Sequence, residues 1–169
     1  MELAMNFKNL CLPVFLAALW SGTANALHEG PAPACPVQTM DGSRTVDLAR
    51  PKGKVTYVDF WASWCPPCAR SFRFMNELHA ELHSQGVEVV AINLDEEPHA
   101  AAEFLQRHPA QFTVVADPKG NCPALYEVQA MPTTYLIDRR GNIRHVHLGF
   151  KEGDREELRR QILSLLNER

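Results

Sequence analysis

Residues 58–68 read Val58-Asp59-Phe60-Trp61-Ala62-Ser63-Trp64-Cys65-Pro66-Pro67-Cys68. The first part of this stretch completes an apolar run over residues 55–61, which is typical of a strand buried at the centre of a sheet. Apolar residues at positions 72, 75, 78 and 82 then follow at helical spacing, up to a glycine at position 86. The two cysteines are therefore predicted where a buried strand ends and a helix begins.

The spacing of Cys65 and Cys68 predicts redox chemistry. A thiolate, not a thiol, attacks a disulfide, so a redox cysteine needs groups that stabilise its negative charge. We expect unpaired N–H groups and the positive end of the helix dipole to face Cys65, and cysteines so placed have pKa values of roughly 3.5 to 7.5 instead of about 8.5. Pro66 and Pro67 suit the first helical positions, where a missing N–H costs little. We predict Cys65 as the nucleophile and Cys68, one turn further on, as the more buried resolving thiol.

The rest of the chain alternates predicted strands and helices. The turn pair Asp41-Gly42 favours a β-hairpin between residues 37–39 and 45–48. A last helix is expected to start at Asp154, with Glu157 completing a capping box. Between them we expect strands over residues 87–94, 112–116, 133–138 and 143–148, a short helix over 98–106 and a helical turn over 122–127. This order predicts an α/β domain with a mixed central sheet flanked by helices.

Length and charge exclude several classes of protein. The chain has 169 residues, 46% of them hydrophobic and 22% charged, which is ordinary for one globular domain. Its 17 basic and 20 acidic residues give a net charge of -3, so the sequence offers no basic field to a nucleic acid. It also contains no glycine-rich phosphate loop and no repeat period. We expect no nucleic-acid partner, no cofactor and no resident metal.

The N-terminal pattern predicts export. An apolar run of 11 residues precedes Ala24-Asn25-Ala26, as in a secretory signal peptide. Spanning a bilayer takes about 20 apolar residues, so cleavage after Ala26 is favoured over a membrane anchor. We therefore expect a signal peptide over residues 1–26, a linker over 27–36, a single domain over 37–169, and a periplasmic location.

Two further cysteines, Cys35 and Cys122, belong to the predicted exported chain. Disulfides persist outside the cytoplasm, so these two can form a structural bridge that closes a long loop. They can equally be two small buried thiols, because connectivity cannot be deduced from spacing. The sequence leaves both alternatives open.

These features together resemble the thioredoxin fold and, within it, the exported TlpA/ResA-like thiol-disulfide oxidoreductases. The resemblance extends from about Pro33 to Leu166 and includes, in the family's order, Asp41-Gly42, Gly53-Lys54, residues 58–68, Met131-Pro132-Thr133-Thr134 and Ile137-Asp138-Arg139-Arg140-Gly141. It implies a thioredoxin-like fold with an N-terminal β-hairpin ahead of the redox motif.

The resemblance implies a substrate-binding surface. Pro132 matches the cis-proline that lies against the redox disulfide in this family and lets the preceding backbone, here Met131, pair with a bound substrate strand. Together with Trp64 and Pro66, these residues form the expected surface for a disulfide-containing protein substrate.

The resemblance also implies two acids near the redox pair. Asp59 matches the buried acid that thioredoxins hold beneath the second cysteine, where desolvation raises the pKa and suits the group to take a proton from Cys68. Glu96 matches the acid that ResA-like proteins hold near the pair, and the sequence does not rank the two. The alternatives are an acid at position 59 held only by local hydrogen bonds, and an acid at position 96 in a solvated loop. The chain departs from many relatives at Ser71 and Arg73, where they carry Glu and Pro.

The predicted function is that of an exported thiol-disulfide oxidoreductase that reduces disulfides in specific periplasmic proteins, with a membrane thiol reductase as its electron donor. A DsbA-like oxidase differs only in reduction potential, and a reduced CPPC pair is also a soft Cu(I) site, so both are alternatives. Structural zinc is disfavoured because it needs two further ligands. His79 with His83, and His145 with His147, have metal-ligand spacing but are more often solvated histidines.

Overall fold

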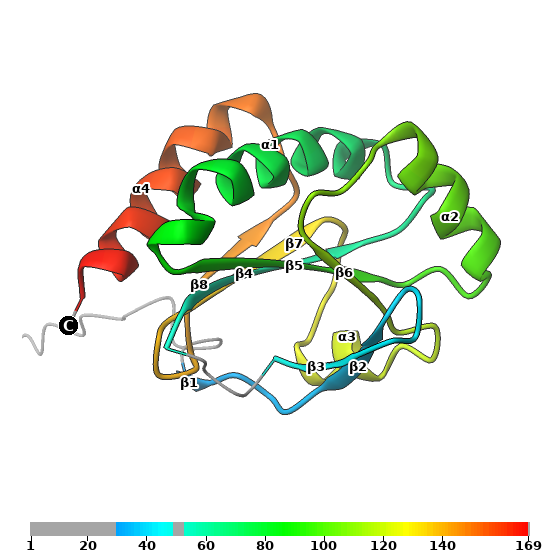
Figure 1. The fold of residues 1–169 in the computed structure, drawn as a ribbon, viewed down its shortest axis with the longest axis horizontal. Coiled ribbons are helices and arrows are strands. Elements are labelled where there is room, and N and C mark those ends of the chain that lie inside the picture. The colour runs from blue at the N-terminus through cyan, green and yellow to red at the C-terminus, as the bar shows by residue number, and fades with distance from the viewer. Residues whose placement is uncertain (1–29, 49–52, 169) are drawn as a thin grey trace, which may run out of the picture.

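A mixed sheet forms the centre of the structure, a computed structural model that describes residues 30–48 and 53–168 (Figure 1). In this part of the chain the sheet has eight strands in the order β1-β8-β7-β4-β5-β6-β2-β3. The strands are β1 (Gly30–Pro31), β2 (Pro36–Thr39), β3 (Thr45–Asp47), β4 (Val55–Trp61), β5 (Val87–Asn93), β6 (Thr113–Ala116), β7 (Thr133–Ile137) and β8 (Asn142–Leu148). The helices are α1 (Pro66–Leu82), α2 (Pro98–Arg107), α3 (Asn121–Leu125) and α4 (Arg155–Asn167), with 3-10 turns at His83–Gln85 and Glu152–Asp154. The α/β architecture and the N-terminal hairpin are as the sequence predicts.

The connections explain why the larger helices share one face. β4, β5 and β6 are parallel neighbours and follow one another in the same direction across the sheet. Crossover connections between parallel strands are right-handed, so α1 and α2 lie on the same face. Figure 1 shows α4 beside α1 on that face, while α3 lies on the other side, near the hairpin of β2 and β3.

Alternation along β4 divides the interior into two cores. Tyr57 and Trp61 point to the core under α1, α2 and α4, whereas Val58 and Phe60 point to the core on the side of α3. Because position 59 has the parity of Tyr57 and Trp61, the carboxyl group of Asp59 lies on the α1 side. The strand therefore places an acid directly beneath the helix that follows the two cysteines.

Residues 30–36 differ from the linker predicted over residues 27–36. β1 pairs with β8, the N–H of Ala32 donates to the C=O of Gly141 at 2.8 Å, and Cys35 is buried. The Pro/Ala-rich composition of this segment gives no local sign of a strand, because the pairing of an edge strand depends on a partner far away in the sequence. Ordered structure thus begins ahead of position 37, while residues 27–29 and the predicted signal peptide lie outside the described residues.

The capping of α4 also differs from the prediction. A 3-10 turn precedes the helix, and the carboxylate of Asp154 accepts the N–H of Lys151 at 2.7 Å. Its Oδ2 also lies 3.1 Å from Nε2 of His147 on β8. The predicted helix start is confirmed, because Asp154 is the N-cap residue of α4, but the predicted capping box with Glu157 is wrong, because the Asp154 side chain makes no cap hydrogen bond and accepts the N–H of Lys151 instead.

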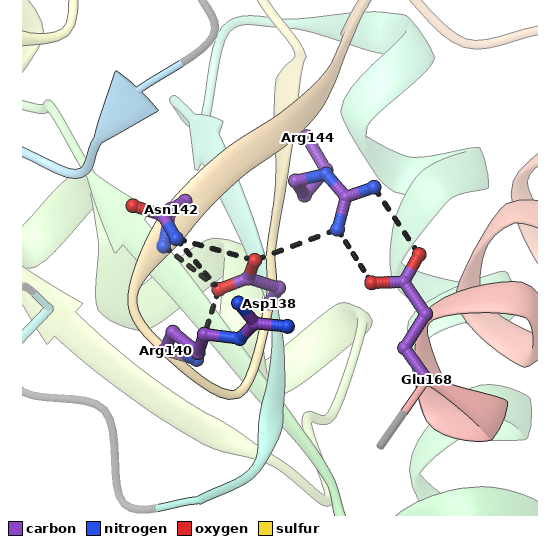
Figure 2. A network of polar contacts seen from close by, with 5 residues as sticks. All are labelled: Asp138, Arg140, Asn142, Arg144 and Glu168. Carbon is purple, nitrogen blue, oxygen red and sulfur yellow. Dashed lines mark hydrogen bonds and ion pairs between the residues drawn. The ribbon is translucent and has the colours of Figure 1, made fainter.

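A polar network ties the β7–β8 turn to the end of α4 (Figure 2). Asp138 Oδ1 accepts the N–H groups of Arg140 and Asn142, each at 2.9 Å. The Arg144 guanidinium lies 3.5 Å from Asp138 and donates to Glu168 at 2.6 and 3.1 Å. Burial alone raises the pKa of Asp138, but these hydrogen bonds outweigh it and hold the pKa below its ordinary value.

No helix in residues 30–48 and 53–168 is both long and apolar enough to cross a membrane.

Candidate active site

The two motif cysteines lie where β4 gives way to α1. Cys65 is the N-cap residue of α1, with extended backbone angles, and its N–H donates to the C=O of Ala62 at 3.1 Å. It forms a disulfide with Cys68, and the two Cα atoms are 5.4 Å apart. Cys65 is 4% exposed and Cys68 is fully buried. The outer sulfur is thus the one within reach of another protein, and the inner one is shielded.

The start of α1 has fewer donors for a thiolate than we expected from the sequence. An N-cap side chain accepts an N–H from the second or third helical residue. Pro66 and Pro67 occupy the first two helical positions and carry no N–H. The N–H of Cys68, at the third position, is the donor that remains, and it already donates to the backbone C=O of Cys65 at 3.1 Å. Charge stabilisation at Cys65 therefore depends mainly on the dipole of a 17-residue helix, because the remaining N–H of the first turn is engaged by a backbone carbonyl.

Asp59 is fully buried under the turn that carries Cys68. Its Oδ1 accepts the hydroxyl of Thr134 on β7 at 2.7 Å, and its Oδ2 accepts the hydroxyl of Ser71 on α1 at 3.2 Å. The Ser71 hydroxyl also lies 3.0 Å from the C=O of Cys68. Desolvation raises the pKa of Asp59 to about 7, against the opposing effect of the two hydroxyls. A group with this pKa exchanges protons at neutral pH.

The second predicted acid, Glu96, is exposed on the loop after β5, and its neighbour Asp95 is buried instead. Asp95 accepts the N–H of Ser63 at 3.0 Å, the hydroxyl of Ser63 at 2.9 Å and the amide of Asn93 at 2.7 Å. Because β4 and β5 are parallel and in register, with Trp61 opposite Asn93, residues just beyond each strand meet at one edge. Asp95 therefore anchors the loop that leads into the CPPC motif, a position that sequence analysis missed, while the predicted role of Glu96 near the redox pair stays a prediction.

The four residues of the expected substrate surface differ in exposure. Trp64 is 68% exposed and Pro66 is also exposed, whereas Met131 is half-buried against the core that contains both motif cysteines. The Met131–Pro132 bond is cis, and the C=O of Pro132 accepts the N–H of Gly149 at 2.7 Å. Met131 precedes β7 and makes no backbone–backbone hydrogen bond to any other described residue. Its N–H and C=O are available to an incoming strand.

The second pair of cysteines forms a disulfide on the opposite side of the sheet. Cys35 is joined to Cys122, with 5.7 Å between the Cα atoms. Asp117 accepts the N–H of Cys122 at 2.6 Å. These three buried residues are the only His, Cys, Asp or Glu side chains within the described ranges that cluster closely enough to hold a metal, and the disulfide engages both sulfurs.

The two histidine pairs do not gain a third ligand. The rings of His79 and His83 lie 4.6 Å apart, one turn from each other on α1. His147 pairs with Asp154. Neither pair belongs to a cluster of three potential ligands in the part of the chain that the structure describes.

Known proteins share both the sequence pattern and the architecture. The chain matches the Redoxin family over residues 28–162. The thiol-disulfide oxidoreductase ResA of Bacillus subtilis (strain 168) is 33% identical over 132 residues, or 78% of this chain and 73% of the relative. A protein designated thiol:disulfide interchange protein DsbE from Chlorobium tepidum shares 45% identity with a TM-score of 0.78, over 83% of this chain and 98% of that one. StoA from Bacillus subtilis shares 25% identity with a TM-score of 0.64, over 76% of this chain and 96% of that one.

The fold is thus thioredoxin-like, and a CPPC disulfide at the start of α1 is the feature around which its site is built. The chain belongs to the Redoxin family and is an enzyme, a thiol-disulfide oxidoreductase of the TlpA/ResA type.

Proposed function

We propose that this enzyme is exported and reduces disulfide bonds in specific periplasmic proteins through the dithiol form of Cys65 and Cys68. The observation that carries the proposal is the position of Cys65, the more exposed of the two cysteines, at the start of α1, with Cys68 behind it above the buried carboxyl group of Asp59, whose pKa is about 7. These are the parts that a nucleophile, a resolving thiol and a proton acceptor require.

The proposed cycle balances two electrons and two protons. The Cys65 thiolate attacks one sulfur of the substrate disulfide, and the other sulfur leaves as a thiolate that takes a proton from solvent. Asp59 then accepts the proton of the Cys68 thiol. The resulting Cys68 thiolate attacks the Cys65 sulfur of the mixed disulfide and expels the second substrate thiolate, which takes up the second proton as Asp59 gives its proton back to solvent; the enzyme is left oxidised, as in the structure. A membrane thiol reductase returns two electrons to the pair.

The substrate side of the site supports a protein as the substrate. Trp64 and Pro66 offer exposed apolar surface beside Cys65, and the backbone of Met131 is open to strand pairing. A strand added at this point gains main-chain hydrogen bonds from Met131 and apolar contact from Trp64. We propose that Pro132 aligns this backbone with the redox pair.

The start of α1 favours a reductant over a DsbA-like oxidase. A strong oxidant owes its potential to a reduced form in which the thiolate is well stabilised. Here Pro67, at the second helical position, removes one of the two N–H groups that could donate to the Cys65 thiolate, and the other, on Cys68, already donates to the C=O of Cys65. We therefore expect a reduction potential closer to the thioredoxin value of about -270 mV than to the DsbA value of about -120 mV.

Export has support of its own. The pattern of residues 1–26 is that of a signal peptide. The disulfide between Cys35 and Cys122 suits an oxidising compartment, where such bonds persist.

Two variants test the proposal. We expect Cys65→Ser to abolish the reduction of insulin disulfides and Cys68→Ser to accumulate mixed disulfides with substrate proteins in the periplasm. A Cys35→Ser/Cys122→Ser variant is the matched control, because it removes the other pair and should retain turnover. Retained turnover in Cys65→Ser overturns the assignment, and tight Cu(I) binding without insulin reduction in the unaltered protein indicates the copper-handling alternative.

A further inference from the structure

Four buried side chains form a continuous hydrogen-bonded chain beneath Cys68. Tyr57, Thr134, Asp59 and Ser71 are all fully or almost fully buried. The hydroxyls of Tyr57 and Thr134 are 3.1 Å apart, and the chain continues through both carboxyl oxygens of Asp59 to Ser71. It ends at the C=O of Cys68, which belongs to the proposed resolving residue.

We infer that the two hydroxyls that contact Asp59 have different tasks. Thr134 donates to Oδ1 in both protonation states and keeps this oxygen unprotonated. Ser71 donates to Oδ2 when Asp59 is ionised and accepts from Oδ2 when this oxygen carries the proton. Both are positioning residues for the proton transfer, and the inference rests on the proposed role of Asp59 as proton acceptor.

The hydrogen bond between Thr134 and Asp59 cannot change direction. Thr134 has one hydroxyl hydrogen and donates it to Oδ1 of Asp59, so Tyr57 must be the donor in the contact between Tyr57 and Thr134. A proton on Oδ1 would turn the Thr134 hydrogen toward Tyr57 and leave the Tyr57 hydrogen in need of another acceptor. Within residues 30–48 and 53–168 the Tyr57 hydroxyl has Thr134 as its one hydrogen-bond partner, and the side chain is shielded from solvent. Protonation on this side therefore leaves a buried donor unsatisfied.

The hydrogen bond between Ser71 and Asp59 can change direction. Ser71 has one hydroxyl hydrogen and two acceptors in reach, Oδ2 of Asp59 at 3.2 Å and the C=O of Cys68 at 3.0 Å; when Asp59 is ionised, the charged oxygen is the stronger acceptor and takes this hydrogen. When Oδ2 carries a proton, that proton can be donated to the Ser71 oxygen, and the Ser71 hydrogen turns to the C=O of Cys68, 3.0 Å away. Every hydrogen then still has an acceptor, because Thr134 continues to donate to Oδ1.

The asymmetry has a measurable consequence. Thr134 stabilises mainly the carboxylate, so its removal makes Asp59 a weaker acid. Ser71 stabilises both forms, once as a donor and once as an acceptor, so its removal changes the acidity less. A simple donor at Ser71 predicts the opposite, namely a clear loss of acidity.

The experiment is a titration of Asp59 in the oxidised protein, followed by the carbon-13 chemical shift of its side-chain carboxyl. We expect Thr134→Val to lower the acidity constant at least tenfold, and Ser71→Ala to lower it less than threefold. Thr134→Ser and Ser71→Thr retain the hydroxyls and serve as matched controls, each expected within threefold of the unaltered protein. If Thr134→Val does not fold, Thr134→Ala gives the same comparison. A loss of acidity in Ser71→Ala that equals or exceeds that of the Thr134 variant overturns the inference.

The titration is independent of catalysis. If Asp59→Asn reduces insulin as fast as the unaltered protein, Asp59 loses its proposed role in the cycle, whereas the titration still reports which hydroxyl serves which form of the carboxyl group.

Discussion

The buried acid makes stability depend on pH in a direction that can be measured. Asp59 is fully buried, and desolvation raises its pKa from 3.8 to about 7. Between these two values the folded protein holds a proton that the unfolded chain has released, so the free energy of unfolding falls as pH rises. Each pH unit between the two pKa values lowers the free energy of unfolding by 1.36 kcal/mol, so the interval of about three units lowers it by about 4 kcal/mol. The stabilisation that the proton on Asp59 gives the folded state is complete below pH 3.8 and is lost as pH rises through about 7.

Asp59→Asn removes the titrating group and keeps the shape of the side chain. We expect the stability of the variant, relative to the unaltered protein, to increase by about 4 kcal/mol between pH 4 and pH 8. The assay is urea unfolding of the oxidised proteins at four or five pH values, with both disulfides intact in every sample. Using the change with pH cancels any constant cost of the amide.

Glu96→Gln is the control for Asp59→Asn, since it removes an exposed acid with the same charge. Its stability relative to the unaltered protein should vary by less than about 0.5 kcal/mol over the same range. A difference for Asp59→Asn that stays within 1 kcal/mol from pH 4 to pH 8 refutes the claim that the carboxyl group is desolvated.

Three further outcomes follow from the site and its support. Pro67→Ala restores an N–H at the start of α1, so the pKa of the nucleophilic thiol should fall, seen as a lower midpoint of thiolate absorbance at 240 nm; an unchanged midpoint contradicts the role of the missing donors. Asp95→Ala should lower the free energy of unfolding by about 2 to 4 kcal/mol, because hydrogen bonds to a charged group contribute about 1.5 to 3 kcal/mol each, whereas Glu96→Gln should change it by less than about 0.5 kcal/mol. Replacing Cys35 and Cys122 together by Ala opens a loop of 87 residues and should cost about 4 to 5 kcal/mol in urea unfolding, with insulin reduction retained at temperatures where the variant is folded.

The elements around the motif could be predicted because their patterns are local. The apolar run of β4 and the helical stripe of α1 each lie within one stretch of sequence, and the turn pair Asp41-Gly42 announces its own hairpin. The same holds for the relation of Cys65 to the helix, since capping position depends on neighbouring residues.

The features that sequence analysis missed depend on distant pairings. β1 finds its partners on β8, more than 100 residues away, so residues 30–31 looked like linker. Asp95 lies near Ser63 only because β4 and β5 run parallel and in register. A search for acids just beyond the ends of neighbouring parallel strands would have suggested Asp95 together with Glu96, and burial then separates them.

The two prolines at the start of α1 have two effects, of which the sequence analysis considered one. The sequence predicts that Pro66 and Pro67 suit the first turn of the helix, and the structure confirms it. Pro67 also withdraws an N–H group from the sulfur of Cys65, a consequence that appears once the N-cap position is known.

The most direct test is the rate at which iodoacetamide alkylates Cys65 in the reduced protein, followed by peptide mapping across pH 5 to 9. Helix-end stabilisation predicts that Cys65 reacts faster at neutral pH than a thiol in an unstructured peptide, with a midpoint below about 8.5. A rate and a midpoint equal to those of the peptide thiol would contradict it.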